Sequence, residues 1–187
     1  MVVRHGRTPA NAAGLLLGRA DPALDGHGRG QAAALAAAIG PVDRVVASPL
    51  RRAQETAAVF GRPVETDERW IELDYGDWEG RPVADIPPET WARWRAELDF
   101  CAPGGECLAD LGTRVRAACD DLLAEAVEST VVVVTHVSPV KAATAWALGV
   151  GDEATWRMYV APASITRIQA RDGRPVLASF DETGHLS

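Results

Sequence analysis

The chain has 187 residues, 47% of them hydrophobic and 24% charged, with a formal net charge of −7, and these values suit one globular domain with a buried core. The negative charge argues against general nucleic-acid binding, which requires clustered cations to neutralise phosphates. No apolar run approaches the roughly 20 residues of a membrane span and no signal peptide precedes Arg4, so we expect a cytoplasmic protein without nucleic-acid or membrane partners.

Three β-branched segments predict strands, at residues 2–3, 44–47 and 131–135. The third is a continuous apolar run, which is typical of a strand buried on both faces. Each segment is followed by a polar stretch and then a helical pattern, and the expected helices are 28–39, 50–60, 108–128 and 140–148. This alternation of strand and helix predicts βαβ units and a largely parallel sheet.

The end of the chain predicts a hairpin. Strand patterns at 164–170 and 176–180 flank Asp172-Gly173, and Asp-Gly is a strong hairpin signal, so we expect an antiparallel edge. Between the second and the third expected strand, tryptophans and prolines interrupt the alternation of strand and helix. This predicts an insertion over about 74–106 with a short helix near 89–98. The expected fold is α/β, in one domain over residues 1–187.

Cys101, Cys107 and Cys119 are an odd set whose spacing matches neither a CxxC pair nor a zinc-ligand pattern with the histidines. We therefore expect three free, partly buried thiols in a reducing compartment, and no metal site.

Basic and imidazole side chains follow the three strands where they end. Arg4 and His5 follow the first strand, Arg51 and Arg52 follow the second, and His136 follows the third. Carboxyl ends of parallel strands meet at one edge of a sheet, so these side chains should converge there. Arginine donates planar, bidentate hydrogen bonds to phosphate, and a neutral imidazole can be a nucleophile. One such residue alone is more often structural, but the set predicts a phosphate site.

Six segments strengthen this interpretation because they occur in one order along the chain: RHGRTPAN, GRADPALDGHGRGQA, ASPLRRAQETA, IELDYGDWEG, PGGECLADLGTR and VVVVTHVSPVKA. Each resembles a motif of the histidine phosphatase superfamily, and together they span most of the chain. The resemblance implies a phosphoglycerate mutase-like fold, a three-layer αβα sandwich whose central sheet is mostly parallel with an antiparallel edge strand.

The same resemblance implies roles for five residues. His5 would be the nucleophile that forms a phosphohistidine, and Glu72 would be the general acid and then the general base. Arg4, Arg52 and His136 would complete the phosphate pocket. No cofactor and no metal are implied, because these cations can stabilise the charge of the phosphoryl group.

Four further residues are weaker candidates for contact with substrate. Asn11 would donate an amide hydrogen bond to a phosphate oxygen, whereas Thr8 suits a helix cap as well as it suits a phosphate. Arg19 could contact substrate or solvent. Val137 stands where many members of the family have glycine, which would make the pocket wall bulkier.

Three functions remain open. We favour a phosphomonoesterase of the histidine acid phosphatase type acting on a small phosphate ester, because the insertion is acidic and rich in tryptophan, and because the ending resembles that of short bacterial α-ribazole-phosphate and broad-specificity phosphatases. The tryptophans suggest a partly apolar alcohol moiety. A phosphoglycerate mutase and a non-catalytic phosphoryl-binding module are the alternatives. A homodimer is left open, since dimers are the commonest soluble oligomers.

Overall fold

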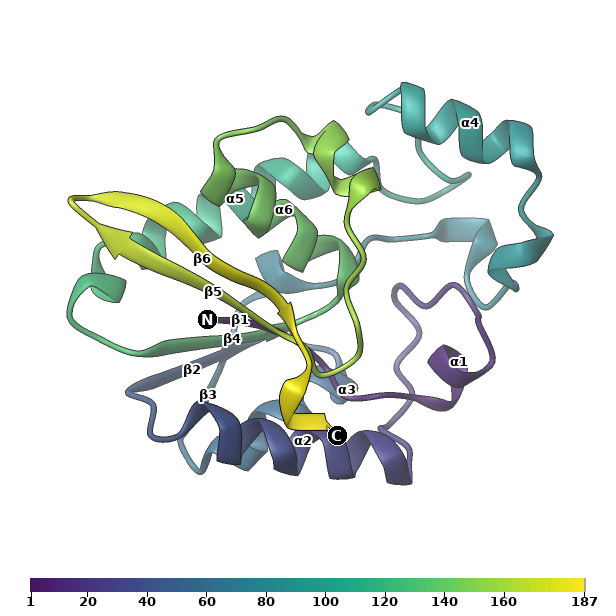
Figure 1. Ribbon diagram of the computed structural model, residues 1–187. Helices are drawn as coiled ribbons and strands as arrows, with labels where there is room; N and C mark the ends of the chain where they lie inside the picture. Colours follow the sequence, from purple (N-terminus) through teal and green to yellow (C-terminus); the bar gives the residue numbers. More distant parts are fainter. Residues whose placement is uncertain (187) are drawn as a thin grey trace.

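The computed structural model describes residues 1–186, and its centre is a six-stranded sheet in the order β3-β2-β4-β1-β5-β6. The strands are β1 (Val2–Arg4), β2 (Arg44–Ala47), β3 (Val64–Thr66), β4 (Val131–Thr135), β5 (Ile165–Arg171) and β6 (Arg174–Glu182). β1 to β4 are parallel, and β5 is antiparallel to both β1 and β6. The expected mixed sheet with an antiparallel edge is confirmed (Figure 1).

Helices cover both faces of the sheet, with α2 on one side and α5 and α6 on the other (Figure 1). The α-helices are α1 (Pro9–Ala12), α2 (Gly26–Ile39), α3 (Arg51–Ala57), α4 (Pro88–Ala96), α5 (Leu108–Leu123) and α6 (Val137–Leu148). Short 3₁₀ turns occupy Ala58–Phe60, Glu68–Trp70, Gly76–Trp78, Val83–Asp85, Glu125–Val127, Asp152–Arg157 and Gly184–Leu186.

The predicted helices are present, but their ends differ from the expected ones. α2 begins at Gly26, two residues early, because the Asp25 carboxylate caps it by accepting a hydrogen bond from the Gly28 amide at 2.7 Å. α6 begins at Val137, three residues earlier than expected. Pro139 does not prevent this, because the first turn of a helix has no hydrogen bond that its missing N–H would lose. The segments 50–60 and 108–128 end in 3₁₀ turns rather than continuing as α-helix.

Alternation along the strands divides the core into two layers. Val2, Val46, Val131 and Val133 belong to a cluster that includes buried residues of α5 and α6. Their neighbours in sequence point to the opposite face, where they pack with buried residues of α2 and α3: Val3, Val45, Ala47, Val132 and Val134. Every residue of β4 is buried, as its continuous apolar run predicts.

The hairpin forms, and a short helix lies in the segment that is expected to be an insertion. β5 and β6 are joined at Asp172 and Gly173, both with positive φ, as a primed hairpin turn requires. Within the insertion, α4 lies at the expected place, and Trp78 and Trp94 are buried in the same cluster as α5.

One expectation about the cysteines is wrong. Cys101 and Cys107 are joined in a disulfide rather than free, because the two residues face each other across a short antiparallel bridge with their Cα atoms 4.3 Å apart. Cys119, in α5, is free and buried, as expected.

Candidate active site

Three strands deliver the predicted side chains to one edge of the sheet. His5 follows β1, Arg52 lies in the first turn of α3 after β2, and His136 follows β4. These side chains are 3%, 0% and 0% exposed, and the centroids of the two imidazole rings are 5.0 Å apart. The structure therefore brings together three groups that are distant in sequence.

The proton of the His5 ring can be placed from its partners. Nδ1 lies 2.7 Å from the carbonyl oxygen of Gly6, which can only accept, so Nδ1 carries the proton and Nε2 keeps its lone pair. The turn is held because the Gly6 amide donates to Oγ1 of Thr56 at 3.1 Å. A Cβ at Gly6 would clash with the backbone of Gly28 in α2, so glycine is required there.

One guanidinium joins the two histidines. Nε of Arg52 lies 3.2 Å from Nε2 of His5 and 3.2 Å from Nδ1 of His136. Its Nη1 donates to the carbonyl oxygen of Ala20 at 2.7 Å, and its Nη2 donates to that of Gly18 at 2.8 Å. All three nitrogens are engaged, so this buried cation is held in one orientation.

His136 immediately precedes α6 and occupies its N-cap position. Because Nδ1 accepts from Arg52, Nε2 carries the proton, and it donates to Oγ of Ser48 at 2.7 Å. Ser48 also accepts from the Leu50 amide at 3.3 Å. The amino end of α6 adds partial positive charge beside this ring, which favours an anion.

Both imidazoles are neutral at pH 7. Burial lowers the pKa of His5 well below its ordinary value, and the positive charges of Arg4 and Arg52 lower it further. Burial likewise lowers the pKa of His136, with His5 and Arg52 adding to the effect. A neutral ring with an unprotonated Nε2 is the form that can attack phosphorus.

Arg4 is a second buried guanidinium at this edge, with 9% of its surface exposed. Its Nη1 donates to the carbonyl oxygen of Val160 at 2.6 Å, while its buried Nε has no partner within residues 1–186. Burial lowers the pKa of Arg4 and the charge of Glu72 raises it, but an arginine side chain stays charged in proteins. A desolvated cation with an unused donor is suited to an anionic ligand.

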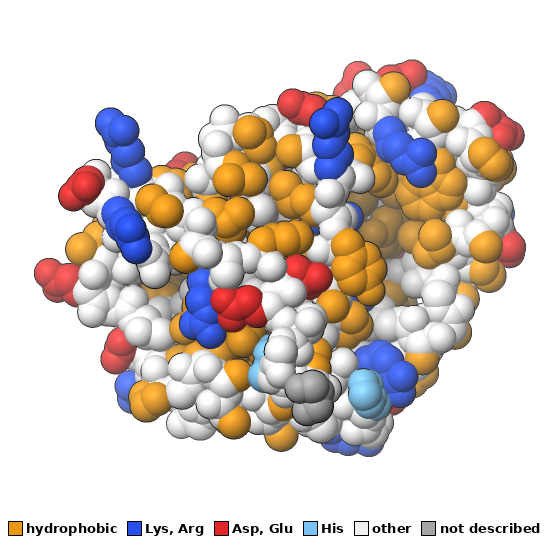
Figure 2. Space-filling view, in the orientation of Figure 1, with side chains coloured by type: hydrophobic (Ala, Val, Ile, Leu, Met, Phe, Trp, Pro, Cys, Tyr) orange, Lys and Arg blue, Asp and Glu red, His pale blue; other side chains and the backbone are white. Residues whose placement is uncertain are grey.

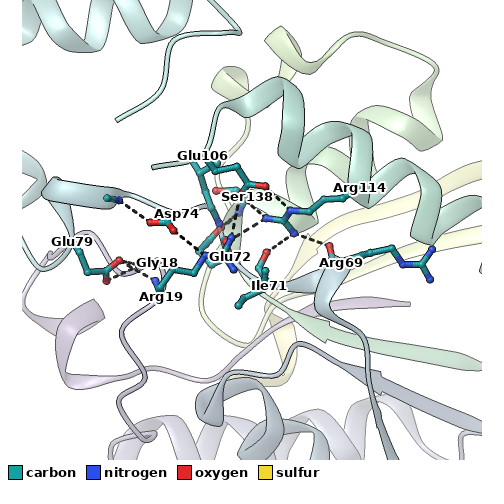
Figure 3. A network of polar contacts seen from close by, with 12 residues as sticks. Gly18, Arg19, Arg69, Ile71, Glu72, Asp74, Glu79, Glu106, Arg114 and Ser138 are labelled. Carbon is teal, nitrogen blue, oxygen red and sulfur yellow. Dashed lines mark hydrogen bonds and ion pairs between the residues drawn. The ribbon is translucent and has the colours of Figure 1, made fainter. Parts of the chain in front are cut away.

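The Glu72 carboxylate is 3% exposed and is fixed by backbone amides. Oε1 accepts from the Leu73 amide at 2.8 Å and from the Ser138 amide at 3.2 Å (Figure 3). Ser138 lies in the first turn of α6, two residues after His136, so the hydrogen bond ties Glu72 to the helix that starts at the second histidine.

Arg114 holds the segment that carries Glu72, a role that the sequence did not reveal. Its Nη1 donates to the carbonyl oxygens of Arg69 and Ile71, each at 2.7 Å, and its Nη2 lies 3.3 Å from that of Glu72 (Figure 3). Glu106 completes the arrangement, with Nε–Oε1 and Nη2–Oε2 distances of 2.7 and 2.8 Å. Both residues lie in PGGECLADLGTR, one of the six segments that resemble family motifs, and this was the sequence signal that could have pointed to them.

Glu79 holds a second segment and was also missed. Its carboxylate accepts from the Gly18 amide at 2.9 Å and from the Arg19 amide at 2.9 Å (Figure 3). These amides belong to the loop whose Gly18 and Ala20 carbonyls bind Arg52. A carboxylate far from the histidines in sequence thus orients the loop that orients their shared cation.

The Arg19 side chain is engaged by acidic groups. It lies 3.6 Å from Asp74 and 3.5 Å from Glu106, and it is 36% exposed (Figure 3). Pairing of Arg19 with acidic side chains was not expected from the sequence.

The three other candidates lie at helix starts. Thr8 is the fully buried N-cap of α1 and forms a capping box with Asn11. Oδ1 of Asn11 accepts from the amide and the hydroxyl of Thr8, at 3.1 and 2.9 Å, which leaves the amide nitrogen of the Asn11 side chain for a ligand. Val137 is the half-buried first residue of α6.

Aromatic side chains form a cluster in the insertion. Figure 2 shows the face hollowed between α4 and the segment that carries α1, with hydrophobic side chains gathered on the α4 side. The rings of Trp91 and Trp94 are stacked with centroids 5.3 Å apart, and Trp156 contacts Trp94 edge-on at 5.5 Å. Burial raises the pKa of Tyr75, whose ring packs on Trp94 at 6.0 Å.

Within residues 1–186 no group of three or more His, Cys, Asp or Glu side chains is arranged to hold a metal ion. In the same part of the chain, no helix has the length and apolar character needed to cross a bilayer.

Two neutral imidazoles are bridged by one buried guanidinium at the carboxyl edge of an α/β sheet, an arrangement whose chemistry suits a phosphoryl group. The family follows from comparison: the model of the histidine phosphatase superfamily (branch 1) matches residues 1–183, and the chain belongs to this superfamily. The predicted fold and family are both confirmed.

The relatives include several phosphatases. The chain is 32% identical over 198 residues to phosphoserine phosphatase 1 of Hydrogenobacter thermophilus, covering 100% of this chain and 93% of the relative. It superposes on phosphoserine phosphatase of Entamoeba histolytica in complex with 3-phosphoglyceric acid with a TM-score of 0.90 and 28% identity, covering 100% and 98% of the two chains. A bifunctional protein of Mycobacterium tuberculosis is 33% identical over 197 residues. The chain spans 54% of that relative, about half its length.

Proposed function

We propose that this protein is a phosphomonoester hydrolase that transfers the phosphoryl group of a small metabolite first to His5 and then to water. The observation that carries the proposal is the unprotonated, buried Nε2 of His5 beside the cations of Arg4 and Arg52. Phosphatases among the relatives support hydrolysis. The two guanidinium groups supply the positive charge that phosphoryl transfer requires.

In the first step, the lone pair on Nε2 of His5 attacks phosphorus, and the bond from phosphorus to the alcohol oxygen breaks. An alkoxide is a poor leaving group, so a protonated Glu72 gives its proton to the departing oxygen. The phosphoryl oxygens are bound by Arg4, Arg52 and His136, whose donors stabilise the charge of the transition state.

In the second step, the Glu72 carboxylate takes a proton from a water molecule, whose oxygen attacks phosphorus. The phosphorus–nitrogen bond breaks, inorganic phosphate leaves, and Nε2 regains its lone pair. Glu72 is protonated again and ready for the next ester. The Ser138 amide keeps the carboxylate at one place through both steps.

The weaker candidates receive secondary roles in this proposal. The side-chain amide of Asn11 donates to a phosphoryl oxygen, while Thr8 orients that amide through the capping box. Arg19 holds Asp74 and Glu106 together at the mouth of the site. Val137 shapes the wall next to His136. We propose one catalytic domain over the whole chain, acting in the cytoplasm without a cofactor.

The test is a phosphate-release screen over diverse phosphomonoesters in the presence of EDTA, comparing the wild type with His5→Ala. His27→Ala is the matched control, because His27 is exposed on α2. We expect release by the wild type and by the control, and none by His5→Ala. Rapid acid-free quenching followed by intact mass measurement should show one phosphoryl group on the wild type and on His27→Ala, and none on His5→Ala.

Other outcomes would replace the proposal. Conversion of 3-phosphoglycerate to its 2-isomer with catalytic 2,3-bisphosphoglycerate, without net phosphate release, would indicate a mutase. Tight phosphate binding without turnover of any ester would indicate a phosphoryl-binding module.

A further inference from the structure

Lys141 is the only lysine of the chain, and it lies on the helix that starts at the active site. It follows Ser138, whose amide binds Glu72, by three residues, so the two residues share a face of α6. Side chains on a helix lean toward its amino end. A long side chain at this position therefore extends back toward the end of α6 where Glu72 and His136 lie.

The ammonium group of Lys141 has no partner. Within residues 1–186 it makes neither a hydrogen bond nor an ion pair, although the residue is only partly exposed. Burial lowers the pKa of Lys141, the charge of Glu72 raises it, and the charge of Arg4 lowers it. The charges that act on this amine are thus those of the catalytic centre.

The other cations of the site are already engaged. Arg4 and Arg52 donate to backbone carbonyls, and Arg19 and Arg114 contact Glu106. A partly desolvated cation without a partner is unfavourable, and an arriving anion relieves this cost. Apart from one unused donor, the Nε of Arg4, the ammonium group of Lys141 is accordingly the cationic group that the described structure leaves for a ligand.

The position relative to Glu72 indicates which part of the ligand Lys141 meets. In the proposed reaction, Glu72 gives its proton to the leaving oxygen, so the alcohol moiety lies next to Glu72. Arg52 and the two histidines, in contrast, surround the phosphoryl group. A free cation coupled to Glu72, and not bonded to Arg52 or the histidines, faces the alcohol moiety rather than the phosphoryl oxygens.

We propose that Lys141 is a specificity-determining residue whose ammonium group binds a carboxylate on the leaving alcohol, so that the protein prefers phosphate esters of small hydroxy acids. A single ammonium matches one carboxylate, whereas a second phosphate is bound best by several guanidinium donors. The inference rests on the proposed function. It differs from the expectation of a partly apolar alcohol, which was drawn from the tryptophan-rich insertion and the net charge of the whole chain and not from the charge at this edge.

The test compares two esters that differ in one group: 3-phosphoglycerate, which carries a carboxylate, and glycerol 3-phosphate, which has a hydroxymethyl group instead. The wild type should prefer 3-phosphoglycerate. Lys141→Met should lower kcat/KM for 3-phosphoglycerate about 10- to 100-fold, as expected for loss of a charged hydrogen bond, mainly through KM. The value for glycerol 3-phosphate should change less than about threefold, and Lys141→Arg should keep most of the preference.

Equal loss on both esters, or a wild type without preference, would overturn the role of Lys141. Hydrolysis of p-nitrophenyl phosphate separates this failure from failure of the proposed function, because it needs His5 but offers Lys141 no carboxylate. If Lys141→Met does not fold, Lys141→Gln takes its place. A binding readout is independent of turnover: 3-phosphoglycerate should raise the melting temperature of His5→Ala more than that of His5→Ala/Lys141→Met.

Discussion

Nε of Arg52 lies 3.2 Å from Nε2 of His5, the one ring nitrogen that the hydrogen bond to Gly6 leaves unprotonated. The cation therefore touches the atom that is expected to attack phosphorus. Its two other nitrogens are held by backbone carbonyls of the loop that contains Gly18 and Ala20. This geometry depends on a planar group with several donors, and it leads to the first prediction.

Arg52→Lys should lower kcat/KM by about two to three orders of magnitude, although the positive charge is kept. A lysine cannot contact both histidines and two carbonyls with one ammonium group. Steady-state phosphate release measures the loss, and Arg51→Lys is the control, because the neighbouring Arg51 side chain is 62% exposed and pairs only with Glu55 among acidic residues. Similar activity of the two variants would show that orientation of the guanidinium is unimportant.

Glu79→Gln should lower kcat more than it raises KM. The carboxylate accepts from the Gly18 and Arg19 amides, and a neutral amide group holds them less strongly, so the loop positions Arg52 less well. We expect a loss of stability of about 1–2 kcal/mol as well. Urea unfolding and kinetics of Glu79→Gln and of the exposed control Glu89→Gln separate the two effects.

Arg114→Lys should damage hydrolysis of alkyl phosphates more than hydrolysis of p-nitrophenyl phosphate. Arg114 holds the backbone of Ile71 and Glu72, and Glu72 is needed as an acid chiefly when the leaving alkoxide is strongly basic. We expect about a tenfold difference between the two losses. A uniform loss on both kinds of ester would mean that Arg114 acts on stability alone, and the exposed Arg93→Lys serves as the reference.

Stability should decrease as the pH falls below about 6.5, the pKa of an unfolded histidine. Burial and the nearby arginines lower the pKa of His5 and His136 in the folded protein, so only the unfolded chain takes up these protons. Each ring then lowers the free energy of unfolding by up to about 1.4 kcal/mol per pH unit, and above that range the effect is absent. Urea denaturation between about pH 8 and pH 5 should give a flatter dependence for His136→Gln than for the wild type. The exposed control His27→Gln should behave as the wild type.

The unreduced, denatured protein should contain one free thiol, that of Cys119. Titration with a thiol reagent in denaturant measures this number, and prior reduction should expose the other two cysteines. Because the disulfide closes a short loop, Cys101→Ser/Cys107→Ser should lose about 2 kcal/mol of stability. Three thiols before reduction would restore the expectation drawn from the sequence.

The features that the sequence predicted share a local signal. The five-residue run of β4 and the polar residues after each strand placed His5, Arg52 and His136 at one edge without any tertiary information. β3 was missed because it is three residues long with two exposed positions, and α1 because four residues show no periodicity. Neither contains enough pattern to distinguish it from a loop.

The roles of Glu79 and Arg114 could not be predicted in the same way. Their side chains act on backbone atoms of residues 18–19 and 69–72, and contacts with backbone leave no trace in the identity of the residues contacted. The disulfide was not predicted for a related reason: it depends on a turn that brings Cys101 opposite Cys107.

The candidate catalytic groups lie at the ends of buried strands, whereas the aromatic cluster of Trp91, Trp94 and Trp156 lies outside the strands. We expect that substitutions in this cluster change which alcohol moieties the proposed hydrolase accepts without moving the imidazoles or their shared guanidinium. In a chain with this architecture, substitutions confined to the insertion can change the range of esters that is hydrolysed. Directed evolution toward new esters should accordingly begin with residues 75–100 and leave the strand ends untouched.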